Sequence, residues 1–299
     1  MKLPITRAYK FMVVHLLCFF IGTSITAQVS TAKSTADLSP VKITSQVKKR
    51  SIPFRFFKPP QLPHQVEFLP HHHVPIPFFE GERFKYSVHW YAINAGFAEI
   101  KISEVKTRRG RKIYHFIAQA WTNSFFSKFF TVNDRIDTYL DSHSFRPRRY
   151  EEHIREGSYS KDRIFKFSHN KHRVMVNKKK YAISQTAQDP FSCLMLLRII
   201  RLVPGQTFTI DVFSSRRVYQ IDMKVGPLQE ISTQLGTFTC FSIEPSLKLR
   251  GRVLEKESSL KMWFTADWRR IPVLMESKVK IGTIKVELIE FSPHPHDNE

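Results

Sequence analysis

The sequence lacks the short motifs that mark the commonest enzyme classes. It has no GxxxxGK loop, GxGxxG fingerprint, HExxH, GxSxG or CxxC. These absences remove the most frequent nucleotide-binding, metalloprotease, serine-hydrolase and thioredoxin-like activities. Glycine is also scarce, at 10 of 299 residues, whereas phenylalanine is abundant at 26. So little glycine among many β-branched and aromatic residues argues against a disordered chain and against a helical bundle.

Acidic residues are too few to balance the basic ones. Asp and Glu total 26 against 47 Lys and Arg, which gives a net charge of +21. Such a charge attracts anionic partners, among them nucleic acid, phospholipid head groups, lipopolysaccharide phosphates and acidic polymers. The alternative is a cationic surface that serves solubility and has no specific partner.

The N-terminus is typical of a secretory signal peptide over residues 1–27. Basic residues precede an apolar run at 11–22, and the segment 23–27 suits a cleavage site. The run is shorter than the roughly 20 residues that a membrane-spanning helix needs, and an uncleaved anchor is the alternative. We therefore expect an exported protein, periplasmic or associated with the outer membrane, that does not bind nucleic acid.

Cysteine is rare in the chain. Cleavage of the signal peptide would remove Cys18 and leave Cys193 and Cys240. An oxidising compartment permits a disulfide between these two. The alternative is two buried thiols that pack as small hydrophobic side chains, because both positions are predicted to face the core.

The rest of the chain divides into a tether, a β-domain and a tail. Residues 28–76 are basic and rich in proline, which removes amide donors and blocks strand pairing. We expect a largely disordered tether there that could dock a protein partner. The predicted β-domain covers 77–292, and 293–299 form a disordered tail. His71–His73 in the tether are interpreted as adventitious ligands, so no metal site and no cofactor are predicted.

Period-two alternation of apolar and polar residues predicts the architecture of the β-domain. In residues 84–90, for example, apolar side chains occupy every second position, as in a half-buried strand. One segment is instead predicted to be a helix over about 190–201, with Asp189 as its cap and Pro190 at its first position. The expected fold is mostly β: a single antiparallel, strongly curved sheet or barrel-like domain with one packed α-helix.

Acidic residues gather in two of the predicted strands. Strand geometry places Asp137 and Asp141 on one face and Asp134 on the other. Paired carboxylates can act as general acid and base. The candidates for such chemistry are Asp134, Asp137, Glu152 and Glu156. In a chain this rich in arginine the alternative is a role in ion pairs and turns, and no catalytic residue is assigned.

A predicted turn after Asp267 combines tryptophan with two arginines. Its functional interpretation is a rim that contacts anions, and its structural interpretation is a braced hairpin turn. Together with aromatic residues elsewhere, this turn supplies the candidate surface for a ligand or partner. That surface comprises Tyr86, Trp90, Trp263, Trp268, Arg269 and Arg270.

Three segments together resemble a known family. They read GERFKYSVHWYAINAGFAEIKI, QDPFSCLMLLRIIRLVPGQTF and MWFTADWRRIPVLMESKVKIGTIKVEL. In this order, over about residues 80–291, they resemble the bacterial domain-of-unknown-function 3108 family. The resemblance implies an exported, mostly β envelope protein with no established reaction, so no catalytic residue can be carried over. The matching positions are Gly81, Glu82, Tyr86, Trp90, Ala95, Gly96, Asp189, Pro190, Leu197, Arg198, Gly205, Trp263, Asp267, Arg270, Pro272 and Gly282.

These observations favour a non-enzymatic envelope protein. It would hold an apolar or lipid-like ligand, or an envelope partner, on a curved sheet, with basic residues meeting anionic head groups. A second hypothesis is a hydrolase that acts on envelope glycan or lipid through clustered carboxylates. A third is a scaffolding protein that docks a partner through residues 28–76.

Overall fold

The computed structural model describes residues 76–106, 110–249, 252–253, 259–279 and 282–292. The predicted signal peptide, the tether up to residue 75 and the tail lie outside the described residues. Within the described ranges, no helix is long and apolar enough to cross a membrane.

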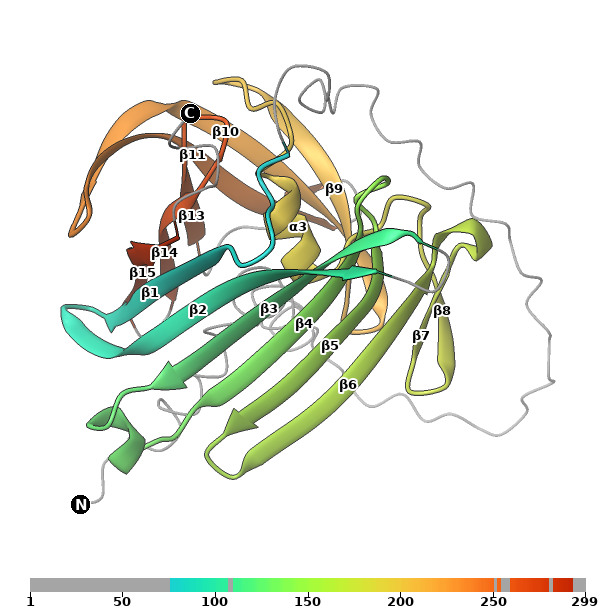
Figure 1. Ribbon diagram of the computed structural model, residues 1–299, viewed down its shortest axis with the longest axis horizontal. Coiled ribbons are helices and arrows are strands. Elements are labelled where there is room, and N and C mark those ends of the chain that lie inside the picture. Colours follow the sequence, from blue (N-terminus) through green and yellow to red (C-terminus); the bar gives the residue numbers. More distant parts are fainter. Residues whose placement is uncertain (1–75, 107–109, 250–251, 254–258, 280–281, 293–299) are drawn as a thin grey trace, which may run out of the picture.

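The described chain folds into a single antiparallel sheet that curves around one α-helix (Figure 1). The strand order is β8-β7-β6-β5-β4-β3-β2-β1-β15-β14-β13-β11-β10-β9, with β12 paired to β11. The strands are β1 (Arg83–Trp90), β2 (Ile93–Lys106), β3 (Lys112–Thr122), β4 (Asn133–Asp141), β5 (Pro147–Glu156), β6 (Tyr159–Ser168), β7 (Arg173–Val176), β8 (Lys179–Ala182), β9 (Thr207–Ser214), β10 (Arg217–Thr233), β11 (Gly236–Leu249), β12 (Arg252–Val253), β13 (Ser259–Thr265), β14 (Pro272–Val279) and β15 (Gly282–Phe291). Two short 3-10 helices, η2 (Phe126–Lys128) and η3 (His169–Lys171), lie in the connections.

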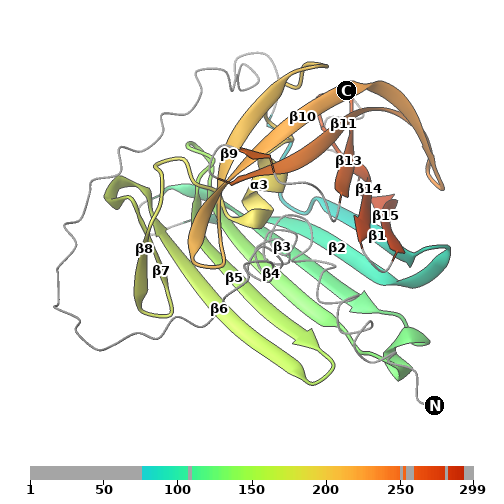
Figure 2. The same cartoon turned by 180° about the vertical axis from the view of Figure 1, so that it is seen from behind.

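The sheet is strongly curved but not closed, which confirms the predicted fold class. Its path over the described residues ends at β8 on one side and at β9 on the other. The chain after β8 partly covers the β9 edge. There the Gln188 amide donates to the Asp211 carbonyl (2.8 Å), and the Phe213 amide donates to the Gln188 carbonyl (2.8 Å). Figure 2, which gives the view from behind, shows the two halves of the sheet facing each other.

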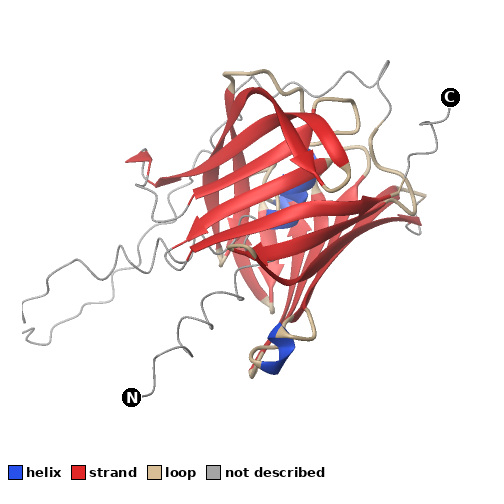
Figure 3. Ribbon diagram, turned by 90° about the vertical axis from the view of Figure 1, so that its left-hand side faces the viewer, coloured by secondary structure: helices blue, strands red, loops and turns tan. Residues whose placement is uncertain are grey.

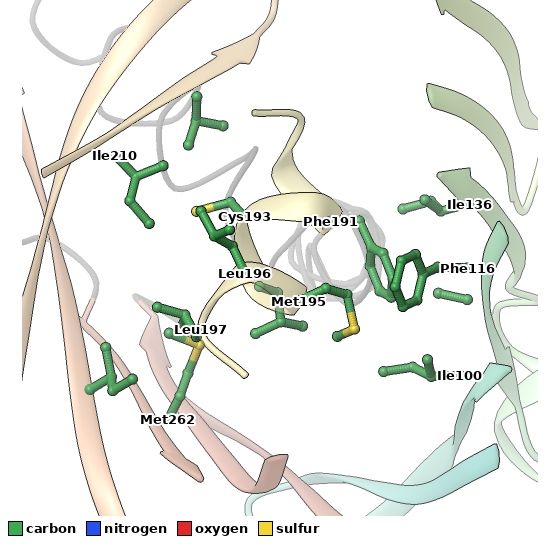
Figure 4. Close-up of a cluster of buried hydrophobic side chains, with 14 of the residues drawn as sticks. Ile100, Phe116, Ile136, Phe191, Cys193, Met195, Leu196, Leu197, Ile210 and Met262 are labelled. Carbon is green, nitrogen blue, oxygen red and sulfur yellow. The ribbon is translucent and has the colours of Figure 1, made fainter. Parts of the chain in front are cut away.

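The concave face is apolar because apolar and polar residues alternate along each strand, and the apolar ones point inward. Its space is occupied by α3 (Pro190–Leu196), every residue of which is buried. Figure 4 shows Phe191 and Met195 pointing toward Phe116 and the β2–β4 side of the sheet. Leu197 points instead toward Met262 on β13. The helix thus joins the two halves of the core.

The start of the helix agrees with the prediction and its end does not. Asp189 accepts hydrogen bonds from the Phe191 and Ser192 amides, and Ser192 completes a capping box. The helix stops at Leu196 instead of continuing to about 201. Beyond it the backbone tightens into a bond from the Arg198 amide to the Met195 carbonyl (3.0 Å). This turn directs the Arg198 side chain to partners just before β1 and in the β13–β14 turn.

Arg198 and Glu82 form an ion pair inside the core. Two guanidinium nitrogens donate to the two carboxylate oxygens, at 2.9 and 2.7 Å. Arg198 also donates to the carbonyls of Pro77 (2.9 Å) and Arg269 (3.1 Å). Because the Arg198 side chain is fully buried, these bonds replace the water that the charge would otherwise need. The pair therefore ties the end of the helix to β1 and to the β13–β14 turn.

Candidate functional site

A basic pocket lies at one end of the sheet, where three strand connections meet. Antiparallel register brings the start of β3, the end of β4 and the start of β5 together. The space between these connections and η3 has a volume of about 690 Å³. Five basic side chains line it: Arg111, Lys112, Arg146, Arg148 and Lys171. One carboxylate, that of Asp141, lines it as well.

Asp141 organises the wall of this pocket. One carboxylate oxygen accepts bonds from the Ser144 amide (3.0 Å) and hydroxyl (3.0 Å), and the other accepts the Arg148 guanidinium (2.6 Å). Burial alone would raise the pKa of Asp141, but the Arg148 guanidinium and the Ser144 donors outweigh it and lower the pKa to about 2. Asp141 is thus committed to holding the β4–β5 turn, and the remaining basic groups set the charge of the pocket.

His169 contributes to the pocket as a neutral ring. Its Nε2–H donates to the Pro147 carbonyl at 2.7 Å, which anchors η3 to the start of β5. Burial lowers the pKa of His169, and the nearby charges of Arg146 and Arg148 lower it further. The positive charge of the pocket at neutral pH therefore comes from its arginines and lysines.

The chemistry of these groups suits the capture of an anion. Arginine presents a planar fork of donors that matches phosphate and carboxylate oxygens, and lysine adds a mobile point charge. Acid–base chemistry normally needs a second titrating group close to the first. Among the described lining residues, the Asp141 carboxylate is already bonded, the buried His169 is held neutral, and the second histidine, His143, is exposed to solvent. The arrangement supports binding more directly than turnover.

The four carboxylates considered for catalysis do not form one cluster. Asp137 lies on the outer face of β4, where it accepts bonds from His115 (2.7 Å) and Arg135 (2.7 Å). Glu152 lies on the inner face of β5 and pairs with Arg163 (2.6 Å). Only Asp134 and Glu156 interact with each other.

Asp134 and Glu156 form a buried carboxyl pair at the end of the sheet opposite to the pocket. Each residue is only 1% exposed. Asp134 accepts the Arg155 amide at 2.7 Å. Burial raises the pKa of both groups, and the neighbouring Asp134 raises that of Glu156 further. Two charged carboxylates close together repel, so the raised pKa of Glu156, about 8, keeps this carboxyl protonated at neutral pH.

The candidate aromatic and arginine surface is spread over several places. Tyr86 is buried on the concave face and donates its hydroxyl to the Pro272 carbonyl (3.1 Å). Trp90 is half-buried at the far end of the same strand. Trp263 is buried on the convex face, in a cluster with Cys240, Val273 and Leu274.

Only the three residues of the β13–β14 turn lie together. Trp268 and Arg269 are partly exposed, and Arg269 pairs with Asp267 at 2.9 Å. Arg270 is buried with its guanidinium 4.6 Å from the centre of the Phe241 ring, and its backbone has φ 48°. The geometry of this turn is that of a braced hairpin, and a ligand at these six residues stays a prediction.

The two cysteines of the domain are free thiols in different layers. Cys193 is buried in α3 and packs in the main core, whereas Cys240 is buried in the cluster on the convex face. Burial raises the pKa of Cys240 to about 12 and also raises that of Cys193. Both side chains thus behave as small hydrophobic residues in this structure.

Sequence reasoning did not single out the basic pocket. Its residues lie in three separate connections, and only the register of β3 to β6 brings these connections side by side. A signal was nevertheless present, because the segments RRGRK (108–112) and RPRR (146–149) are dense in arginine and both are placed at strand ends. The order and pairing of the strands would have been needed to see that these strand ends lie side by side.

The fold and the pocket define an open, barrel-like β-sheet protein with a cationic pocket at one end. A family model described as "Protein of unknown function (DUF3108)" matches residues 85–289. The chain therefore belongs to the DUF3108 family. No curated protein matches it.

Several solved structures are similar in part. A β-barrel-like protein of the DUF1849 domain from Brucella abortus matches with a TM-score of 0.48 and 9% identity, over 73% of this chain and 99% of that one. A protein with a YmcC-like fold from Bacteroides fragilis matches with a TM-score of 0.34 and 10% identity, over 76% of this chain and 100% of that one. A hypothetical protein from Chlamydia trachomatis has a TM-score of 0.33 and 8% identity, over 72% and 87%. These likenesses are too weak to bear on function.

Proposed function

We propose that the protein is an exported, non-enzymatic binding protein of the bacterial envelope that holds a phosphate-bearing anion in its basic pocket. The ligand is either the head group of an anionic lipid or a free phosphate ester, because both offer the same oxygens to arginine and lysine. The observation that carries the proposal is the pocket of about 690 Å³, with five basic side chains and one internally bonded carboxylate.

The geometry favours a head group over an acyl chain. Burial of an acyl chain needs an apolar cavity, and the concave face over the described residues is packed by α3 and by the side chains around it (Figure 4). The hydrolase hypothesis finds less support, because the one interacting pair among the four candidate carboxylates is shielded from solvent. The scaffolding hypothesis concerns residues 28–76, of which only Ile76 is described.

The test is titration with glycerol phosphate and, in a second arm, with vesicles that contain phosphatidylglycerol. Both arms compare the wild type with an Arg146→Glu/Lys171→Glu variant, which keeps Arg148 because Arg148 holds Asp141. The expected result is binding that weakens with salt and falls by about tenfold or more in the variant. Binding in the vesicle arm alone would identify the lipid head group as the ligand. Binding in the glycerol phosphate arm would identify a free phosphate ester.

The matched control is Arg217→Glu/Lys224→Glu, which makes the same charge change on β10 outside the pocket. If the control loses binding as strongly as the pocket variant, the effect is general electrostatics and the proposal is wrong. Equal binding by the wild type and the pocket variant would also refute it.

A further inference from the structure

Exposed apolar side chains concentrate at the end of the sheet opposite to the basic pocket. Of the eight large hydrophobic residues that are exposed in the described chain, five lie here. They are Tyr91 (61% exposed), Ile93 (55%), Phe125 (59%), Phe129 (65%) and Tyr159 (48%). We call these five residues the aromatic tip. Exposed apolar side chains are ordinary when scattered, and such a concentration marks an interaction surface.

The aromatic tip is built from three connections that are bonded to one another. The β1–β2 turn is held to the β3–β4 connection by the Asn123 side-chain amide, which donates to the Asn94 carbonyl (2.8 Å). The β5–β6 turn joins the same connection through the Gly157 amide, which donates to the Thr131 carbonyl (2.8 Å). In Figure 1 these three connections lie together at the lower left.

A small buried cluster supports the exposed rings from beneath. Phe126 in η2 is buried against Ala95 and Val132, with Trp90 and Phe130 packed beside them. Phe125 stacks edge-on against Phe126 (5.5 Å between ring centres) and against Phe129 (5.4 Å). The rings that face solvent are therefore held on a fixed base. Figure 3 shows η2, the lower of the two blue helices, at a projecting end of the sheet.

The charge of this end is low and positive. The segments 91–97, 122–133 and 157–161 contain no Asp or Glu, and their charged residues are Lys128 and Lys161. Three carboxyls adjoin these segments in the sequence. Asp134 and Glu156 are buried, and the half-exposed Asp162 is paired with Arg155 at 2.9 Å and with His153 at 2.8 Å. An apolar end with a lysine between two pairs of phenylalanines matches the interface of a bilayer. There, aromatic rings sit at the level of the head groups and lysine reaches their phosphates.

We propose that the aromatic tip docks on the surface of a lipid bilayer. Phe125 and Phe129 enter the interface, Tyr91 and Tyr159 lie at its level, and Lys128 contacts anionic head groups. A bilayer can close around three separate projecting turns, whereas a protein partner would need a socket shaped for each of them. The docked orientation leaves the basic pocket at the far end of β3 to β6. The inference stands independently of the ligand proposed for that pocket.

The test measures co-sedimentation of the protein, purified in its exported form, with vesicles of phosphatidylcholine alone or with added phosphatidylglycerol. The Phe125→Ser/Phe129→Ser variant is expected to lose about tenfold in partitioning onto both kinds of vesicle. Lys128→Glu should lose a few-fold on the anionic vesicles only. The matched control is Leu228→Ser/Leu235→Ser, which removes two other exposed apolar side chains on β10 and the β10–β11 turn, and it should partition as the wild type does.

Three results would overturn the proposal. The first is equal partitioning of the Phe125→Ser/Phe129→Ser variant and the wild type, and the second is an equal loss in the Leu228→Ser/Leu235→Ser control. The third is no vesicle binding by the wild type, with a dimer that the tip variant dissociates, because the tip would then bind a second copy of the chain. The Arg146→Glu/Lys171→Glu pocket variant should still bind phosphatidylcholine vesicles, so failure of the pocket proposal and failure of this one give different results.

Discussion

The two ends of strand β4 hold a carboxylate in opposite states. At the pocket end, Asp141 is surrounded by donors, and the Arg148 and Ser144 bonds lower its pKa despite burial. At the tip end, Asp134 is also buried but lies beside Glu156, and burial raises the pKa of both. Burial is common to the two sites, so the local donors decide the sign of the shift.

The surfaces around these two carboxylates also differ, in charge and in apolar character. The pocket end collects arginine and lysine from three connections, and the tip end presents phenylalanine and tyrosine with almost no charge. One set of strands thus separates a charged surface from an apolar one by the length of β4, about nine residues or roughly 30 Å. The difference shows how an antiparallel sheet can carry two unlike surfaces with a shared core.

The largest effect is expected in the core between the two ends, at the buried ion pair of Glu82 and Arg198. Glu82→Gln should lower the free energy of unfolding by about 3 kcal/mol or more, because Arg198 would remain charged in the core without its partner. Denaturant unfolding measures this, and the thermal stability of both ends should fall together. Arg83→Gln is the control on the neighbouring residue: the Arg83 side chain is 41% exposed in its pair with Glu99, so the loss should be much smaller than for Glu82→Gln. Equal losses in the two variants would show that the buried pair of Glu82 and Arg198 has no special role in stability.

At the pocket end, Asp141→Asn should cost about 1 to 2 kcal/mol at pH 7, because the bonds to Arg148 and Ser144 lose their charge. The folded pKa lies below the usual value of 3.8, so this stability is present above that value and is lost as pH falls toward about 2. Urea titrations between pH 5 and 2 should show a steeper loss in the wild type than in the variant. Parallel curves would mean that Asp141 does not hold the turn.

At the tip end, the dependence of stability on pH has the opposite sign. The folded pKa of Glu156 is raised from 4.5 to about 8, so its contribution is fully favourable below about 4.5 and is lost as pH rises through 8. Glu156→Gln removes the charge that must form in the buried pair. The variant should therefore become more stable than the wild type as pH rises from about 4.5 toward 8, and the two should be alike at pH 4. A variant that is less stable at every pH would show that the charge of Glu156 does not destabilise the buried pair.

The smallest effect on stability is expected for the exposed rings. Phe125→Ser should change the free energy of unfolding by no more than about 0.5 kcal/mol, because the side chain is 59% exposed. Phe126→Ala, one residue along, removes a buried ring and should cost about 2 kcal/mol or more. Thermal denaturation of the two variants separates the exposed from the supporting part of the tip. A large loss for Phe125→Ser would mean that this ring belongs to the core.

Much of the fold could be read from local pattern. Alternation predicted the strands, and the Asp189–Pro190 pair predicted the start of α3, because a capping side chain and its first amides are neighbours in sequence. Parity along β4 also placed Asp134 opposite to Asp137 and Asp141, as the register confirms. The end of α3 was predicted about one turn too late, because the partners that turn Arg198 away are more than 70 residues distant in the chain.

The sequence by itself determined the family, through the three segments that resemble it. It also determined the mostly β architecture and the basic character of the chain, because composition and period-two alternation act locally. Only the tertiary structure decided which charges meet. Arg146 and Lys171 come to one pocket, Asp134 comes to Glu156, and Thr131 comes to Gly157, because antiparallel pairing aligns connections that are far apart in sequence. Register is a property of whole strands, and no single segment contains it.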